Sequence, residues 1–170
     1  IPDLVFAGTS EGIFRSENNF QSFSFTQTGS SWEYNQDYDY IEFHPTNENI
    51  IYASTYNEDS KIYVSSDAGL SFIQSGNISG NNSNIRLSVS AACENCVFIG
   101  TSDGVWKSEN LGETFSLISN PGISNYGAFV VNDIDTNYMI LGDIDTHRSI
   151  DGGETFNQVT YWATGNANYD

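Results

Sequence analysis

The side chains of this 170-residue chain that could carry covalent or metal chemistry are few. Cys93 and Cys96 are its two cysteines, and they lie in an expected turn before a strand. This pair predicts either a local disulfide, which an oxidising compartment favours, or two free thiols. Zinc would need a second ligand pair, and the two histidines, His44 and His147, are far apart in the repeat described below. We therefore expect a disulfide between Cys93 and Cys96, no metal and no cofactor.

Acidic side chains dominate the charge and exclude several classes of partner. The 22 Asp+Glu residues against 5 Lys+Arg give a formal net charge of −17. Phosphate backbones and anionic membrane surfaces would be repelled by this charge. No stretch approaches the roughly 18 apolar residues of a membrane-spanning helix. The chain is 38% hydrophobic and 14% aromatic, which is too apolar for a disordered tail. We expect no binding to nucleic acid and no membrane insertion.

The most informative pattern is an octapeptide, Ser-x-Asp/Asn-x-Gly-x-Ser/Thr-Phe, which occurs four times. Its leading serines stand at positions 16, 65, 108 and 149, which gives spacings of 49, 43 and 41 residues. The first copy is degenerate, because Phe20 stands where the others have glycine. The shared positions are Ser16, Asn18 and Phe23, then Ser65, Asp67, Gly69 and Phe72, then Ser108, Asn110, Gly112 and Phe115, and finally Ser149, Asp151, Gly153 and Phe156.

The physical chemistry of the octapeptide predicts a turn between two antiparallel strands. The Asp or Asn side chain accepts backbone N–H bonds within the turn, and glycine supplies a positive φ. The aromatic residue begins the next strand and packs inward. Because the motif recurs regularly, these residues are expected to be structural, and no catalytic residue is predicted among them.

The repeated octapeptide resembles the Asp-box, also called the sialidase or BNR repeat. Each period of about 40–45 residues also contains four short strand candidates rich in Val, Ile, Phe, Tyr and Thr, and no long helical pattern. The resemblance and this count together predict an all-β fold, a partial β-propeller of four-stranded antiparallel blades with about four blades present. His44-Pro45 ends an innermost strand, where a turn role is favoured over a general base.

The same register divides the chain into blades of one propeller domain. Residues 1–30 form an incomplete blade with strands two to four, and residues 31–80, 81–122 and 123–162 form complete blades. Residues 163–170 lead into a further blade, because they parallel the segment before the innermost strand at residue 40. We expect a segment of a larger protein, with the rest of the parent propeller as a partner. A four-bladed ring closed by its two ends is the alternative.

Propeller topology would place the turns between second and third strands, and the connections between blades, on one face. The aromatic and acidic residues expected on this candidate ligand face are Trp32, Tyr34, Tyr56, Asp59, Asp103, Tyr126, Asp143, Asp145 and Trp162. Aromatic rings stack on sugar rings and carboxylates accept their hydroxyl hydrogens, and the same set would suit a cationic peptide. The alternative is that the carboxylates only confer solubility and the aromatics bridge neighbouring blades.

Catalysis receives less support from the sequence than binding. Asp-box sialidases need an arginine cluster, a Tyr–Glu pair and an acid/base carboxylate. Arg15 and Arg148 share one repeat position, held by Val64 and Lys107 in the other blades, which indicates strand-surface residues. Asp-box xyloglucanases use two aspartates across a cleft between two propellers, and no spacing here singles out such a pair. A fragment of such a glycoside hydrolase is the alternative function.

The chain also resembles large surface proteins exported by the bacterial type IX pathway. The resemblance lies in recurring strand–turn–strand segments, here residues 43–55 and residues 144–156, the second followed by Tyr161-Trp162. Sortilin-like receptors and photosystem assembly factors carry related repeats. The cysteine pair and the missing glycine of the first octapeptide depart from that pattern. The resemblance implies a secreted or cell-surface propeller that binds a protein or glycan and does not catalyse.

Overall fold

The computed structural model describes residues 3–28, 37–56, 61–76, 78, 85–123 and 127–161, and every regular element in them is a β-strand. The first sheet contains β1 (Val5–Thr9), β2 (Gly12–Ser16) and β3 (Ser24–Thr28). The second contains β4 (Tyr38–Phe43), β5 (Ile51–Thr55), β6 (Ile62–Ser65) and β7 (Ser71–Ser75). The third contains β8 (Arg86–Val89), β9 (Val97–Thr101), β10 (Gly104–Ser108) and β11 (Ser116–Ser119). The fourth contains β12 (Ala128–Val131), β13 (Met139–Gly142), β14 (Thr146–Ser149) and β15 (Asn157–Gln158).

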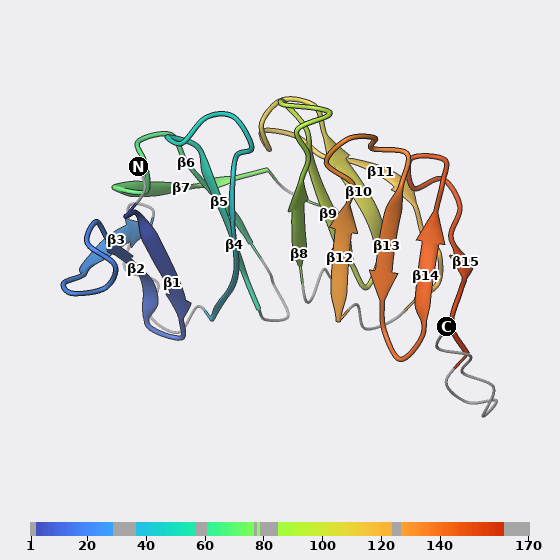
Figure 1. The fold of residues 1–170 in the computed structure, drawn as a ribbon, viewed down its shortest axis with the longest axis horizontal. Helices are drawn as coiled ribbons and strands as arrows, with labels where there is room; N and C mark the ends of the chain where they lie inside the picture. The colour runs from blue at the N-terminus through green and yellow to red at the C-terminus, as the bar shows by residue number, and fades with distance from the viewer. Residues whose placement is uncertain are drawn as a thin grey trace.

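Within each sheet, consecutive strands pair antiparallel, as tight turns between short strands require. The outermost strand of the first sheet also touches the second sheet through a short parallel pairing of Gln27 with Ser71 and Thr28 with Phe72. The sheets stand side by side in an arc, with β1–β3 at one end and β12–β15 at the other (Figure 1). The predicted all-β partial propeller is confirmed.

The sheets at the two ends of the arc differ from the two between them. The first has three strands in the described part of the chain, and β1 forms its inner edge. The last ends with β15, which covers only Asn157–Gln158. β15 lies at the end of the arc, where no further sheet of the described residues packs against it (Figure 1).

The apolar core is divided among the three junctions between neighbouring sheets. Phe6 and Ile13 of the first sheet meet Ala53 and Phe72 of the second. Tyr52 and Ile62 of the second meet Leu87 and Ile99 of the third. Phe98 and Val105 of the third meet Phe129 and Leu141 of the fourth. The second and third sheets therefore each bury one side against the sheet before and the other side against the sheet after, which is how blades stack.

No helix in the described part of the chain is long and apolar enough to cross a membrane.

Candidate functional site

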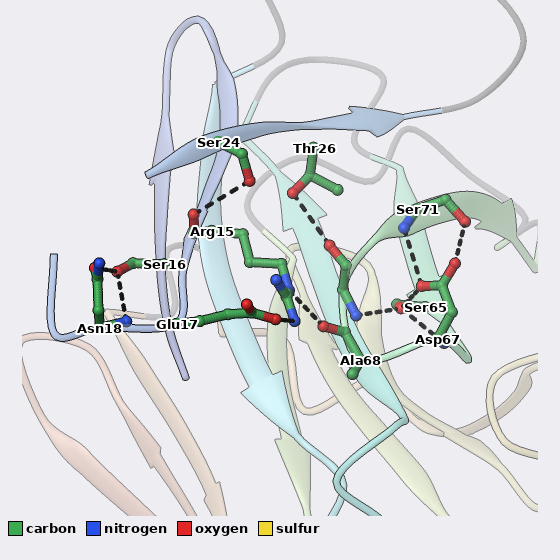
Figure 2. Close-up of polar contacts among 11 residues, drawn as sticks. Arg15, Ser16, Glu17, Asn18, Ser24, Thr26, Ser65, Asp67, Ala68 and Ser71 are labelled. Atoms are coloured by element: carbon green, nitrogen blue, oxygen red, sulfur yellow. Dashed lines mark hydrogen bonds and ion pairs between the residues drawn. The ribbon is translucent and has the colours of Figure 1, made fainter. Parts of the chain in front are cut away.

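The four octapeptides form the same turn, each joining the last two strands of its sheet. In the second, Ser65 Oγ donates to Asp67 Oδ1 at 2.7 Å and accepts the Gly69 N–H at 2.8 Å. Asp67 accepts the Ser71 N–H at 2.9 Å and the Ser71 hydroxyl at 2.6 Å (Figure 2). Ser149, Asp151 and Thr155 repeat these bonds. Asn110 and Asn18 accept the equivalent backbone N–H groups of Thr114 and Ser22 through Oδ1.

Two consecutive residues in each turn have a positive φ, whereas the sequence pattern pointed only to the glycine. Ala68 and Gly69 have φ of 58° and 77°, and Leu111 and Gly112 have 58° and 91°. Asn19 and Phe20 keep the same conformation at 53° and 61°, so the first turn forms without its glycine. A residue with a side chain is strained in this region.

The hydrogen bonds of these turns perturb the two aspartates. Burial acts to raise the pKa of Asp67, but the hydrogen bonds from Ser71 and Ser65 together outweigh it and lower the pKa. The hydrogen bonds from Thr155, followed by that from Ser149, lower the pKa of Asp151. Both carboxylates thus accept hydrogen bonds from residues of their own turns.

Each of the last three octapeptide turns also receives a hydrogen bond from the sheet before it. Thr26 donates to the Gly69 carbonyl at 3.1 Å, Ser75 to Gly112 at 2.7 Å and Ser119 to Gly153 at 2.5 Å. The sequence motif did not reveal these bonds, because they connect an outer strand with a turn about forty residues later. They tie neighbouring sheets together at their outer rim.

The expectation that Arg15 is a strand-surface residue is wrong. Its side chain is only 7% exposed, and its Nε donates to the Ala68 carbonyl of the next sheet at 2.7 Å, while Nη2 lies 2.8 Å from Glu17 Oε1 (Figure 2). Arg148, at the same repeat position, is exposed as expected. The position faces the following sheet, so an arginine there is buried only where such a sheet is present.

A second set of turns joins the first two strands of the later sheets, and each is capped by the residue that precedes it. His44 Nδ1 accepts the N–H groups of Thr46 and Asn47, and Asn132 Oδ1 accepts those of Ile134 and Asp135. Ser90 Oγ accepts one from Ala92. These bonds support a turn role for His44. In the Ser90 turn, Cys93 and Cys96 form the expected disulfide.

A recess of about 320 Å³ lies between the first two sheets. Thr9 and Ser10 line it from the end of β1, Asp37, Tyr38 and Asp39 from the start of β4, and Tyr56 from the residue after β5. The Tyr56 N–H donates to the Asp37 carbonyl at 2.6 Å, which ties together the two segments of the second sheet that line the recess. Tyr56 is 48% exposed, so part of this residue is accessible to a ligand.

Of the candidate ligand-face residues that the structure describes, only Tyr56 lines this recess. Asp103 lies in the β9–β10 turn and Asp143 and Asp145 in the β13–β14 turn, where Gln158 Nε2 donates to Asp145 Oδ2 at 2.7 Å. Trp32, Tyr34, Asp59, Tyr126 and Trp162 lie outside the described residues. Thr9 and Ser10 were missed by the sequence analysis; the Gly-Thr-Ser run at residues 8–10, repeated at residues 100–102, was the available signal.

Arg86 lies near the rim of the recess and shows how a cation is held there. Arg86 Nη1 lies 3.0 Å from Asp39 Oδ2, and its guanidinium carbon lies 4.7 Å from the centre of the Tyr40 ring. A carboxylate beside an aromatic face attracts cations. Asp37, Asp39, Ser10 and Tyr56 in the lining of the recess suit a hydroxyl-rich or cationic ligand. The Thr9 hydroxyl is already bonded within its own turn, where it donates to the Gly12 carbonyl and accepts the Glu11 N–H. No group of three or more His, Cys, Asp or Glu side chains that could hold a metal is found within the described ranges.

Comparison with known proteins gives similarity at the level of structure. No family model and no curated protein matches the chain. The GH74 xyloglucanase from Xanthomonas campestris superposes with a TM-score of 0.72 and 15% sequence identity, over 92% of this chain and 28% of that one. An ancestral GH74 enzyme gives 0.70 and 20%, over 94% and 22%. A chain of the nidogen/laminin complex gives 0.65 and 15%, over 92% and 59%.

The chain thus spans about a quarter of the length of the GH74 enzymes that it resembles. At these identities the likeness concerns the fold alone, which GH74 enzymes and the nidogen/laminin chain share. Together with the four sheets arranged in an arc, the comparisons identify the chain as a β-propeller in which about four blades are present.

Proposed function

We propose that the chain is a binding module of a secreted or cell-surface protein, and that it takes a protein or glycan ligand in the recess between its first two blades. The observation that carries this proposal is the recess, where the exposed Tyr56 lies beside Asp37, Ser10 and Asp39, the last of which also pairs with Arg86. Such a lining accepts sugar hydroxyls or ammonium groups. The net charge of −17 disfavours anionic sugars.

Two further observations support a secreted or cell-surface location. The bonds within the octapeptide turns support their assignment as Asp-box repeats, a motif of extracellular propellers in the families that the sequence resembles. The disulfide between Cys93 and Cys96 supports an oxidising compartment. The rest of a parent propeller remains a proposed partner.

The proposal can be tested by calorimetric titration of the chain with two probes, a neutral xyloglucan oligosaccharide and a lysine-containing peptide. Binding of either probe should weaken about tenfold or more in the Tyr56→Ala and Asp37→Asn variants. Tyr138→Ala is the matched control, because Tyr138 is equally exposed at 50% but lies in the turn before β13, away from the recess. Loss of binding in the control alone, or unchanged binding in both recess variants, would contradict the proposal.

The alternative, a fragment of an Asp-box glycoside hydrolase, is favoured by the likeness to GH74 enzymes at the level of the fold. This alternative is tested by measuring the release of reducing ends from xyloglucan. Turnover that a single Asp37→Asn or Asp39→Asn change abolishes would replace the binding proposal with the catalytic one.

A further inference from the structure

The strand that leads out of the recess contains a β-bulge. Tyr38 pairs with Thr55 and Tyr40 with Ser54, so Asp39 is an extra residue of β4 without a counterpart in β5. Residues two apart in a regular strand share one face, whereas a bulge turns them to opposite faces. Tyr38 is accordingly buried in the core between the first two sheets, and Tyr40 packs against the core between the second and third. From this bulge, Asp39 lines the recess.

Asp39 holds a cation that the chain itself supplies. Arg86 lies in β8, which contacts β4 (Figure 1), and its side chain is only 12% exposed. Its Nη1 is 3.0 Å from Asp39 Oδ2, and its guanidinium carbon is 4.7 Å from the centre of the Tyr40 ring. A carboxylate together with an aromatic face suits a guanidinium, which is planar, always charged and weakly hydrated. A filled guanidinium site thus adjoins the recess.

A second carboxylate and a second tyrosine lie within the recess. The backbone holds them together, since the Tyr56 N–H donates to the Asp37 carbonyl at 2.6 Å. Both residues are exposed. The Asp37 carboxylate has no hydrogen bond or ion pair within the described part of the chain, and neither lysine nor arginine is among the described residues that line the recess. Asp37 and Tyr56 therefore combine the same two groups that hold Arg86, and the charge of Asp37 is not compensated by the lining.

The electrostatics of the chain favour a cation over a neutral sugar at this carboxylate. A net charge of −17 raises the local concentration of positively charged ligands and speeds their association. A guanidinium can donate two parallel hydrogen bonds to one carboxylate and neutralise its charge. A sugar hydroxyl donates one hydrogen bond and leaves the charge in place. An arginine side chain therefore satisfies Asp37 more completely than a sugar does.

We propose that the recess binds the guanidinium of an arginine side chain on a partner protein, with Asp37 as its counter-charge and Tyr56 in contact with it. This inference rests on the binding function proposed above and names the ligand group. Arg86 already occupies Asp39, which leaves Asp37 as the carboxylate for the partner. These residues belong to or adjoin the second and third sheets, which have all four strands in the described part of the chain. The site is therefore built from blades in the interior of the sequence.

Titration of the isotope-labelled chain with two blocked pentapeptides, followed by NMR, tests the proposal. One peptide has a central arginine, and the other has citrulline, which keeps the shape of arginine without its charge. The arginine peptide should bind about tenfold or more tightly and shift the amide signals of Asp37 and Tyr56. Asp37→Asn should abolish this preference. Asp143→Asn should retain it, because Asp143 is an exposed carboxylate in the β13–β14 turn, outside the recess. Circular dichroism checks that both variants are folded.

A neutral xyloglucan oligosaccharide is the third probe and separates this inference from the function on which it rests. Sugar binding that shifts the same signals, without a preference for arginine over citrulline, would overturn guanidinium recognition and leave ligand binding in the recess standing. A preference for arginine that persists in Asp37→Asn would mean that the net charge holds the peptide, which also overturns the proposal. If none of the three probes binds, this inference and the proposed function both fail.

Discussion

The guanidinium of Arg15 joins the first two blades by donating from Nε to the Ala68 carbonyl at 2.7 Å, although the two residues are 53 positions apart in the sequence. The same carbonyl belongs to a turn whose conformation is fixed by Ser65 and Asp67. A buried cation thus holds a strand of one blade against the octapeptide turn of the next. Glu17, 64% exposed, partly balances its charge.

Arg15→Ala should lower the free energy of unfolding by about 2–3 kcal/mol, because it removes a charge-assisted hydrogen bond and leaves the Ala68 carbonyl buried without its donor. The measurement is urea denaturation of dilute protein followed by tryptophan fluorescence. Arg148→Ala is the matched control from the same repeat position, and its exposed side chain predicts a change within about 0.5 kcal/mol. Equal effects of the two substitutions would refute the buried role of Arg15.

Arg15 is buried and Arg148 is exposed, although both occupy the same repeat position, and this contrast shows which features the sequence can predict. The period, the strands and the octapeptide turns could be predicted because they depend on local residue types: Asp67 and Gly69 have the same role wherever the motif occurs. The burial of Arg15 could not be predicted in this way, since it depends on whether another blade follows. The recess was predicted only in part, because Tyr56, Asp37 and Thr9 meet through the packing of two blades and not through a motif.

The two octapeptide aspartates predict an acid-sensitive contribution to stability. Asp67 and Asp151 both have a lowered pKa in the folded chain. Their contribution is therefore fully present above about pH 4, the unfolded value, and is lost as the pH falls through the folded-state pKa. Urea unfolding midpoints measured at decreasing pH should fall steeply in this window for the wild type and less steeply for an Asp67→Asn/Asp151→Asn double variant.

Asparagine is the informative substitution for Asp67, because Asn110 already stands at the equivalent position of the third octapeptide. Asn110 Oδ1 accepts the Thr114 N–H at 2.9 Å and its Nδ2 donates to Thr114 Oγ1 at 3.0 Å, so the turn forms without a carboxylate. At neutral pH Asp67→Asn should cost less than Asp67→Ala, which removes the acceptor and is expected to cost about 1–2 kcal/mol. Glu113→Gln controls for the loss of one exposed charge. If both Asp67 variants were equally destabilised, the acceptor role would be disproved.

His44 offers a similar comparison in the turn between β4 and β5. His44→Asn should preserve stability to within about 0.5 kcal/mol, because Asn132 already accepts two backbone N–H groups at the equivalent position. His44→Ala should cost about 1–2 kcal/mol, since the N–H groups of Thr46 and Asn47 lose their acceptor. Thermal unfolding of the two variants beside the wild type measures the difference. A larger loss in the asparagine variant than in the alanine variant would argue against capping.

The disulfide between Cys93 and Cys96 should make only a modest contribution to stability. The Cys96 N–H donates to the Cys93 carbonyl at 2.9 Å, and Ile50 and Tyr138 make the equivalent bonds to Asn47 and Asp135 without a disulfide. The turn therefore forms from its backbone bonds and its cap alone. Closing so short a loop is expected to stabilise the chain by about 2 kcal/mol in the chain-entropy model.

Reduction with a thiol reagent, verified by the mass increase after alkylation, should accordingly lower the unfolding midpoint while the strand content seen by circular dichroism is retained. A Cys93→Ser/Cys96→Ala variant should show a similar loss and no further response to the reagent. Cys96 is 1% exposed against Phe98 and Leu141, so an intact alkylated adduct at Cys96 would require local opening of the third junction. Alkylation of the reduced chain at Cys96 much faster than global unfolding would mean that the disulfide, and not the backbone bonds of the turn, holds this junction closed.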